Sequence, residues 1–157
     1  MEKRHYYELT TAWTGNKGTG TYGYQRYDRS YTLSCKDKPA IYGSSDPAFR
    51  GDKHKYNPEE LLVASLSSCH MLWYLHLCAE AGVIVVAYID QAEAIMVESP
   101  DGGGKFEAVT LKPLVTVKSV DMVEAAKELH QKANELCFIA NSVNFQVFHQ
   151  AEIVHLG

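Results

Sequence analysis

The residues best suited to chemistry lie in one apolar stretch, NPEELLVASLSSCHMLWYLHLCAEAG, which runs from Asn57 to Gly82 and carries two thiols and two imidazoles. On a helix that turns ~100° per residue, Cys69 and Cys78 face opposite sides, so they cannot form a disulfide with each other. Cys69 and His76 share a face but are two turns apart. The helix geometry therefore gives Cys69 no direct partner within this stretch.

Metal binding and inert packing are the simpler interpretations of these residues. No two histidines of the helix have the i, i+4 spacing of a helix-borne zinc site, so we expect neither a metal nor another cofactor. A free cysteine in an apolar helix usually packs as a small hydrophobic residue. We keep that interpretation for Cys35 and Cys78, and we expect His70 and His76 to pack in a core or an interface.

Length and charge restrict the class of protein. A chain of 157 residues predicts a single domain, residues 1–157. The net charge of −4 argues against a nucleic-acid partner. Tyrosines interleaved with Arg26 and Arg29 would suit base stacking, but an exposed β-strand explains them better. These tyrosines are Tyr22, Tyr24, Tyr27 and Tyr31.

The N-terminus, MEKRHYYEL, lacks the apolar region of a signal peptide. The segment Leu61–Ala79 is interrupted by serines and histidines, which we interpret as too polar for a membrane span. We therefore expect a cytoplasmic protein that does not contact membrane. In that compartment four cysteines indicate free, redox-active or metal-binding thiols better than a disulfide framework.

The first half of the chain predicts N-terminal strands, a loop and a long helix. The loop, Lys36–Tyr56, contains one short strand around Ile41. Asn57 suits the N-cap, with Glu60 as its capping-box partner, and Gly82 suits the position after the helix end. Apolar residues occupy nearly every face of this helix, so we expect it to be central and covered on most sides.

The second half predicts strands and one more helix. Residues 83–99 suggest one long strand or a bent pair, and Pro100–Phe106 a turn before a second strand over 107–119. An amphipathic helix is expected to open at Asp121, with Glu124 at capping-box spacing, and residues 142–156 form a last strand. Strands and helices are grouped rather than alternating, which favours an α+β fold.

Two motifs resemble the OsmC/Ohr family, the osmotically inducible and organic-hydroperoxide-resistance proteins. The stretch NPEELLVASLSSC is similar to the family signature, in which the reactive cysteine follows the first glutamate by ten positions, as Cys69 follows Glu59. The stretch CFIANSVN at Cys137 is similar to the looser motif of the second family cysteine. The expected order of elements also resembles that of the family over essentially the whole chain.

The resemblance implies a stress-response peroxidase that reduces organic hydroperoxides. Cys69 would attack the peroxide and become a sulfenic acid, and Cys137 would resolve it as a disulfide. A dithiol reductant of the lipoyl type would then restore both thiols. The resemblance further implies an interleaved homodimer, with sites built from both subunits.

A buried peroxidatic thiol needs a nearby cation, because an apolar surrounding disfavours the thiolate. The family uses an arginine held by the glutamate that corresponds to Glu59. On a straight helix Glu59 and Cys69 lie ~15 Å apart, so an arginine from a loop or another chain must bridge them. In AFRGD, Arg50 is close to one family position, with Arg26 and Arg29 as alternatives; at the other family position this chain has only Lys17.

The chain departs from the family at two places. Phe138 stands where the family usually has proline after the resolving cysteine, and CHMLWYLHLC replaces the usual pattern around Cys69. These departures favour the alternative of a non-catalytic protein that binds a small hydrophobic ligand. A third hypothesis, hydrolysis by a cysteine nucleophile, would need a histidine within reach of Cys69 and an orienting carboxylate.

Overall fold

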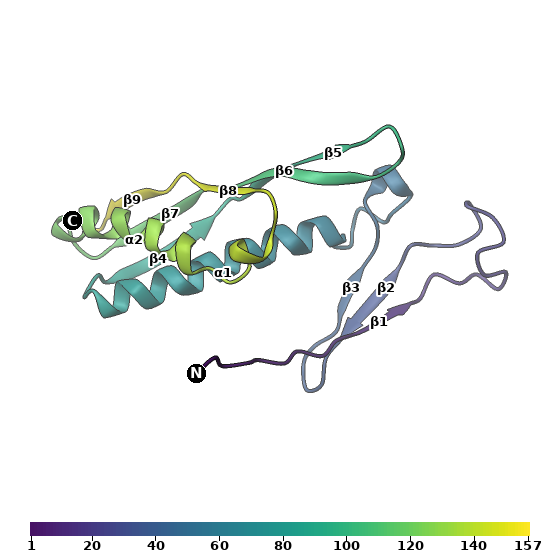
Figure 1. Ribbon diagram of the computed structural model, residues 1–157, viewed down its shortest axis with the longest axis horizontal. Coiled ribbons are helices and arrows are strands. Elements are labelled where there is room, and N and C mark those ends of the chain that lie inside the picture. Colours follow the sequence, from purple (N-terminus) through teal and green to yellow (C-terminus); the bar gives the residue numbers. More distant parts are fainter. The chain divides into compact units, whose positions relative to one another are not determined.

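The computed structural model describes residues 1–157, and its contacts divide the chain into two compact units, Met1–Leu61 and Leu62–Gly157. The first contains a small antiparallel sheet, and the second contains two further sheets and two helices (Figure 1). The single domain expected over residues 1–157 stays a prediction.

The sheet of the first unit has the order β1-β2-β3. Its strands are β1, Thr10–Trp13; β2, Tyr31–Ser34; and β3, Ile41–Gly43. Tyr31 is opposite Gly43, where a Cβ atom would lie 2.2 Å from the tyrosine ring, so the register requires glycine. Tyr22, Tyr24 and Tyr27 lie in the turns between β1 and β2, so their expected placement in a strand is wrong.

The long helix, α1, spans Pro58–Glu80 and has the expected ends. The Oδ1 atom of Asn57 accepts a hydrogen bond from the Glu60 amide at 2.8 Å, and the Glu60 carboxylate accepts one from the Asn57 amide at 3.1 Å. Gly82 adopts a φ of 73°, and the Val83 amide donates to the carbonyl of Cys78 at 2.9 Å. This capping box and C-terminal glycine motif confirm both predicted helix boundaries.

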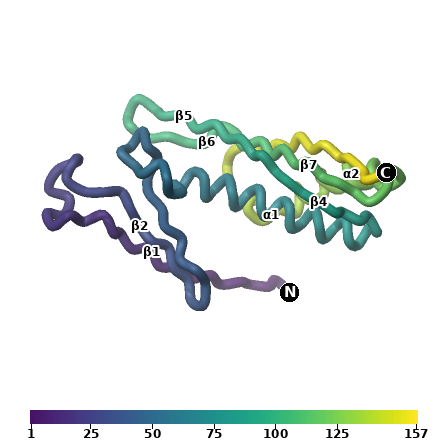
Figure 2. The backbone as a smooth tube through the Cα atoms, turned by 180° about the vertical axis from the view of Figure 1, so that it is seen from behind, coloured from purple at the N-terminus to yellow at the C-terminus, as the bar shows by residue number.

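The second unit has two sheets, of order β4-β7-β9 and β5-β6-β8. In each sheet the first pair of strands is antiparallel and the second pair is parallel. The strands are β4, Val85–Asp90; β5, Glu93–Glu98; β6, Gly104–Leu111; β7, Pro113–Val117; β8, Gln146–His149; and β9, Glu152–His155. Figure 2 shows the β5–β6 hairpin continuing from β4 and β7.

All three long strands expected after α1 are broken in two. The bent pair is confirmed for β4 and β5, whereas the single strands expected over residues 107–119 and 142–156 are wrong. At the break between β6 and β7, the Lys112 amide donates to a carboxylate oxygen of Asp90 at 2.7 Å instead of to a neighbouring strand. Pro113, which follows, has no amide hydrogen to donate.

The second helix, α2, spans Val123–Leu136 and begins later than expected. Residues Val120–Met122 form a 3₁₀ turn, and Met122 is the N-cap, with no side-chain capping bond. The capping role predicted for Asp121 is therefore wrong, because the 3₁₀ turn includes that residue. Glu124 instead pairs with Lys127 at 3.1 Å on the helix surface.

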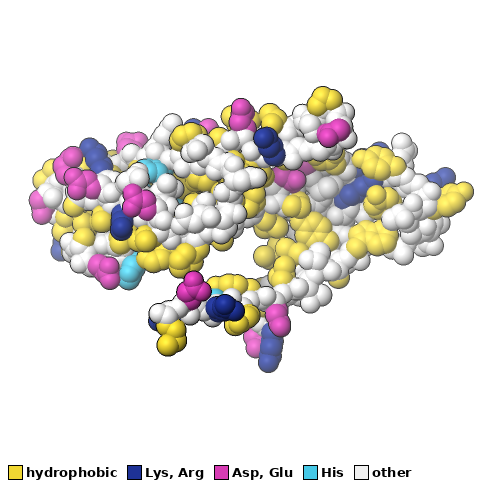
Figure 3. Space-filling model, in the orientation of Figure 1, with side chains coloured by type: hydrophobic (Ala, Val, Ile, Leu, Met, Phe, Trp, Pro, Cys, Tyr) yellow, Lys and Arg dark blue, Asp and Glu magenta, His cyan; other side chains and the backbone are white.

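Only one stripe of α1 is buried. Its members, four residues apart, are Leu66, His70, Tyr74 and Cys78, and they pack toward the sheets and α2. Leu72 is 63% exposed, and hydrophobic side chains lie along the lower edge of this unit in Figure 3. The expectation that α1 is covered on most sides is therefore wrong for the single chain, whose sheets and α2 cover one side.

By length and composition alone, α1 is apolar enough to cross a membrane. The core helix of a soluble protein passes the same test. The polar residues within Leu61–Ala79 therefore do not by themselves exclude a membrane span, as the sequence-based interpretation assumed.

Candidate functional site

Two thiols from different helices meet in the second unit. Cys69 lies on α1 and is partly exposed, whereas Cys137 is the C-cap of α2 and is 1% exposed. The two side chains lie close enough together for Cys69 to raise the pKa of the Cys137 thiol. The structure therefore brings together two cysteines that are 68 residues apart in the sequence (137 − 69 = 68).

The environment of Cys137 favours its neutral form. Burial raises the pKa of the Cys137 thiol, and the contact with Cys69 raises it further. The amides of Ala140 and Ile139 act in the opposite direction, and the Ala140 nitrogen lies 3.4 Å from the sulfur. The burial effect is the largest, so Cys137 stays protonated at neutral pH while Cys69 is the thiol that solvent and ligands can reach.

Cys69 lines an apolar pocket of about 430 Å³. The other lining residues are Leu72, Trp73, His76 and Phe138. The rings of Trp73 and Phe138 meet edge to face, with centroids 5.5 Å apart. His76 is held by Glu80 at 3.5 Å on the exposed side of α1. The pocket suits the hydrocarbon part of a small molecule, whose polar group would meet the Cys69 sulfur.

Arg50 and Glu59 belong to the first unit, and they do not pair with each other. Arg50 follows the 3₁₀ turn Pro47–Phe49 with a φ of 65°, and its guanidinium carbon lies 6.0 Å from the ring centre of Tyr24. Glu59 lies in the first turn of α1, and its buried Oε2 atom has no hydrogen-bond partner. The catalytic roles expected for both residues stay predictions.

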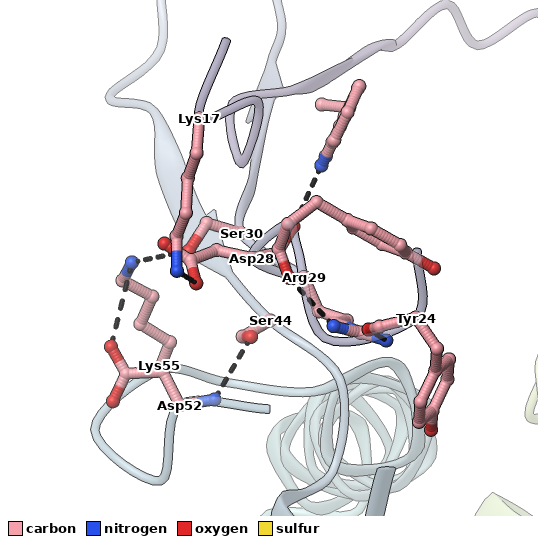
Figure 4. A network of polar contacts seen from close by, with 10 residues as sticks. Lys17, Tyr24, Asp28, Arg29, Ser30, Ser44, Asp52 and Lys55 are labelled. Atoms are coloured by element: carbon pink, nitrogen blue, oxygen red, sulfur yellow. Dashed lines mark hydrogen bonds and ion pairs between the residues drawn. The ribbon is translucent and has the colours of Figure 1, made fainter. Parts of the chain in front are cut away.

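The two alternative arginines have different surroundings. The guanidinium of Arg29 lies 4.4 Å from the ring centre of Tyr24 and 4.0 Å from that of Tyr27, and it donates hydrogen bonds to both of their carbonyl oxygens (Figure 4). Arg29 thus closes the β1–β2 loop on itself. Arg26 is exposed, and Lys17 pairs with Asp28 at 2.7 Å.

Sequence reasoning missed a buried histidine pair that joins the two helices carrying the thiols. The Nε2 atom of His70, on α1, lies 2.9 Å from the Nδ1 atom of His130, on α2, and each residue is 1% exposed. The two rings are nearly parallel, at 6°, and are joined edge to edge with centroids 5.3 Å apart, and the His149 ring stacks against both. His130 lies on the buried stripe of α2 between Ala126 and Ala133, a sequence signal that could have shown its burial.

The histidine pair predicts a loss of stability in acid. Burial, followed by the charge of neighbouring histidines, lowers the pKa of His70 to about 4 and that of His130 to about 3. An unfolded histidine titrates near pH 6.5, so the unfolded chain binds more protons below that pH. The contribution of the neutral pair to the free energy of unfolding is fully present above pH 6.5, and it is lost as the pH falls toward about 4.

Urea unfolding at pH 7 and pH 4.5 measures this loss, which we expect to be ~5 kcal/mol for the two histidines together. The double variant His70→Phe/His130→Phe lacks the pair, so its loss of stability over the same pH range comes from the other titrating groups and serves as the control. The parent should lose more stability than the variant between the two pH values. Equal losses in both proteins would contradict the neutral state of the pair.

The chain belongs to the family of OsmC-like proteins, whose model matches residues 51–152. The match includes Cys69, Cys137 and the pocket residues. The fold is the OsmC-like α+β fold, as the sequence predicted. No curated protein matches the chain.

Solved structures support the same fold. An OsmC-like protein of unknown function from Vibrio cholerae is 28% identical, with a TM-score of 0.84, over 95% of this chain and 100% of the other. An organic hydroperoxide resistance protein from Elizabethkingia anophelis is 15% identical, with a TM-score of 0.64, over 98% and 99% of the two chains. A similar protein from Legionella pneumophila is 16% identical, with a TM-score of 0.64, over 96% and 99%.

Proposed function

We propose that the protein is a thiol-dependent peroxidase that reduces organic hydroperoxides through Cys69 and Cys137. The observation that carries the proposal is the contact between these thiols beside an apolar pocket. Relatives of the same fold are named organic hydroperoxide resistance proteins. The different exposure of the two thiols supports the roles in which Cys69 reacts with the peroxide and Cys137 resolves the product.

The reaction cycle has three steps. The Cys69 thiolate attacks the terminal oxygen of the hydroperoxide, the O–O bond breaks, and the alcohol leaves after taking a proton, so that Cys69 becomes a sulfenic acid. Cys137 loses its proton, its sulfur attacks the sulfenic sulfur, and water leaves as the disulfide forms. A lipoyl-type dithiol then reduces the disulfide, becoming oxidised itself, and restores both thiols.

The raised pKa of Cys137 suits its place in this cycle. A thiol that stays protonated does not compete with Cys69 for the peroxide, and it can donate a hydrogen bond to Cys69. Such a hydrogen bond would stabilise the thiolate that must attack first. Once the sulfenic acid has formed, the resolving sulfur is already adjacent to it, so no large movement of α2 is needed.

Arg50 is the cation that we assign to the activation of Cys69, with Glu59 as its partner. Arg29 is engaged with two tyrosines and their carbonyls, whereas Arg50 forms no ion pair. The unpartnered Oε2 atom of Glu59 is a ready acceptor for a guanidinium.

A homodimer would supply such a guanidinium from the second chain and would cover the exposed face of α1. We place this dimer in the cytoplasm.

The substrate class follows from the pocket, which has an apolar lining for a hydrocarbon body. With dihydrolipoamide as reductant, we expect kcat/KM for cumene hydroperoxide to exceed that for hydrogen peroxide by ~100-fold, because only the larger substrate buries apolar surface. Consumption of each peroxide measures the ratio. Equal rates with both peroxides, or no turnover of either, would remove the proposal.

Phe138 is expected to contribute to substrate binding. Phe138→Ala removes one wall of the pocket and its contact with Trp73, so KM for cumene hydroperoxide should rise ~10-fold while the rate with hydrogen peroxide stays the same. Phe138→Leu keeps an apolar wall and is the matched control, with a rise of less than ~3-fold. An equal loss with both peroxides would show that Phe138 acts on resolution instead of on binding.

A non-catalytic binding protein is the second candidate, favoured by the nearly complete apolar lining of the pocket. In that case the thiols only line the wall, and a hydrophobic ligand would bind without oxidation of Cys69. Calorimetric titration of the Cys69→Ser variant with cumyl alcohol tests this function separately. Tight binding together with absent peroxide turnover in the parent would favour the second candidate.

A further inference from the structure

The buried histidine pair links the two helices that carry the reactive thiols. His70 follows Cys69 directly on α1, and His130 lies seven residues, about two helical turns, before Cys137 on α2. The second ring nitrogens, Nδ1 of His70 and Nε2 of His130, are buried and have no partner. The bond of 2.9 Å between the rings is therefore the one hydrogen bond that either ring makes.

Tyr74 adds a second link at the same place. It lies one turn after His70, its ring stacks on that of His130 with a centroid distance of 3.8 Å, and its hydroxyl donates to the carbonyl of Ala126 at 3.1 Å. The helices are thus joined by two directional hydrogen bonds in a core that is otherwise apolar. Directional bonds fix the register of two helices more strictly than apolar contacts, which can slide.

We propose that the hydrogen bond between His70 and His130 is a positioning device that holds the Cys137 thiol against Cys69. The two histidines do not touch the substrate; they act through the helices. A shift of α2 by one residue, 1.5 Å along its axis, would break the bond between the rings and move Cys137 away from Cys69 together with the helix. The inference rests on the proposed function, in which the two sulfurs must join.

The groups around the pair keep it neutral. His149, at the end of β8, stacks on both rings without a hydrogen bond to either, and Tyr74 packs on the other side of His130. Neither His70 nor His130 is in an ion pair with a carboxylate. Nε2 of His70 and Nδ1 of His130 are taken up by the bond between the rings, and no three His, Cys, Asp or Glu side chains form a group that could hold a metal ion.

The test compares the effective concentration of Cys137 at Cys69 with the stability of the fold. Equilibration of the reduced protein with buffers of reduced and oxidised glutathione measures this concentration without any peroxide. His70→Phe and His130→Phe each leave one further buried nitrogen unpaired, so each should lower the stability and reduce the effective concentration by ~10-fold. The double variant replaces both partners by apolar rings and should recover the thermal stability.

The double variant decides between positioning and packing. A positioning role predicts that its effective concentration stays ~10-fold below that of the parent, although its Tm has recovered. His149→Phe, which keeps the stacking, is the matched control and should behave as the parent. If effective concentration and Tm recover together, or if the single variants keep the effective concentration of the parent, the inference is wrong.

If the phenylalanine rings prevent folding, the double variant His70→Leu/His130→Leu takes their place, with the same expected results. The glutathione measurement is independent of peroxidase activity. A disulfide that forms in glutathione but never with a hydroperoxide would contradict the proposed function and leave the positioning role intact.

Discussion

Replacing Cys69 by serine should abolish peroxidase activity, with kcat/KM for cumene hydroperoxide falling ~1,000-fold or more. A serine hydroxyl is not ionised at neutral pH and cannot form a sulfenic acid. Because Cys69 is partly exposed, the variant should fold with a Tm close to that of the parent. Peroxide consumption with dihydrolipoamide, measured at equal protein concentration, is the assay.

Cys78→Ser is the matched control on the same helix. Cys78 is buried, and burial raises the pKa of its thiol, so it is unsuited to attack a peroxide. The substitution should lower stability by ~1 kcal/mol and leave kcat/KM within ~3-fold of the parent value. A Cys69→Ser variant as active as the Cys78→Ser variant would contradict the role of Cys69.

Replacing Cys137 by serine should separate the first chemical step from turnover. The variant should still release about one equivalent of alcohol per chain, because Cys69 is intact. The steady-state rate should then fall ~100-fold, since the sulfenic acid must wait for an external dithiol instead of reacting with an adjacent thiol. A sulfenic-acid trap should label Cys69 in the variant and not in the parent.

Excess peroxide provides a second measurement on the same variant. A sulfenic acid that is not captured is oxidised further to the sulfinic acid, so Cys137→Ser should lose activity irreversibly while the parent does not. Cys35→Ser, on a cysteine in the first unit, is the control and should behave as the parent. Unchanged turnover and unchanged resistance to peroxide in Cys137→Ser would show that another group resolves Cys69.

Local sequence signals predicted the elements around the site well. The N-cap pair of Asn57 and Glu60 and the glycine at position 82 gave both ends of α1, because capping depends on residues near each other in sequence. The prediction failed at Asp121, whose capping-box spacing competes with a 3₁₀ turn that the sequence does not reveal. The break at Lys112 depends on the carboxylate of Asp90, 22 residues away.

The residues of the site were predicted only where local sequence motifs mark them. Cys69 and Cys137 were named from their motifs, but their contact depends on the packing of α1 on α2, which only the fold shows. The histidine pair was missed because nothing local joins His70 to His130, 60 residues apart. The prediction that α1 is buried on most sides was wrong for the single chain. Composition shows that a helix face is apolar, but it does not show what covers that face.

Peptide mapping after one equivalent of cumene hydroperoxide tests the central claim, the closure of Cys69 onto Cys137, most directly. The account predicts one cross-linked peptide pair that contains these two cysteines and has lost two hydrogens, with Cys35 and Cys78 still free thiols. No cross-link, or a random mixture of links among the four cysteines, would contradict it.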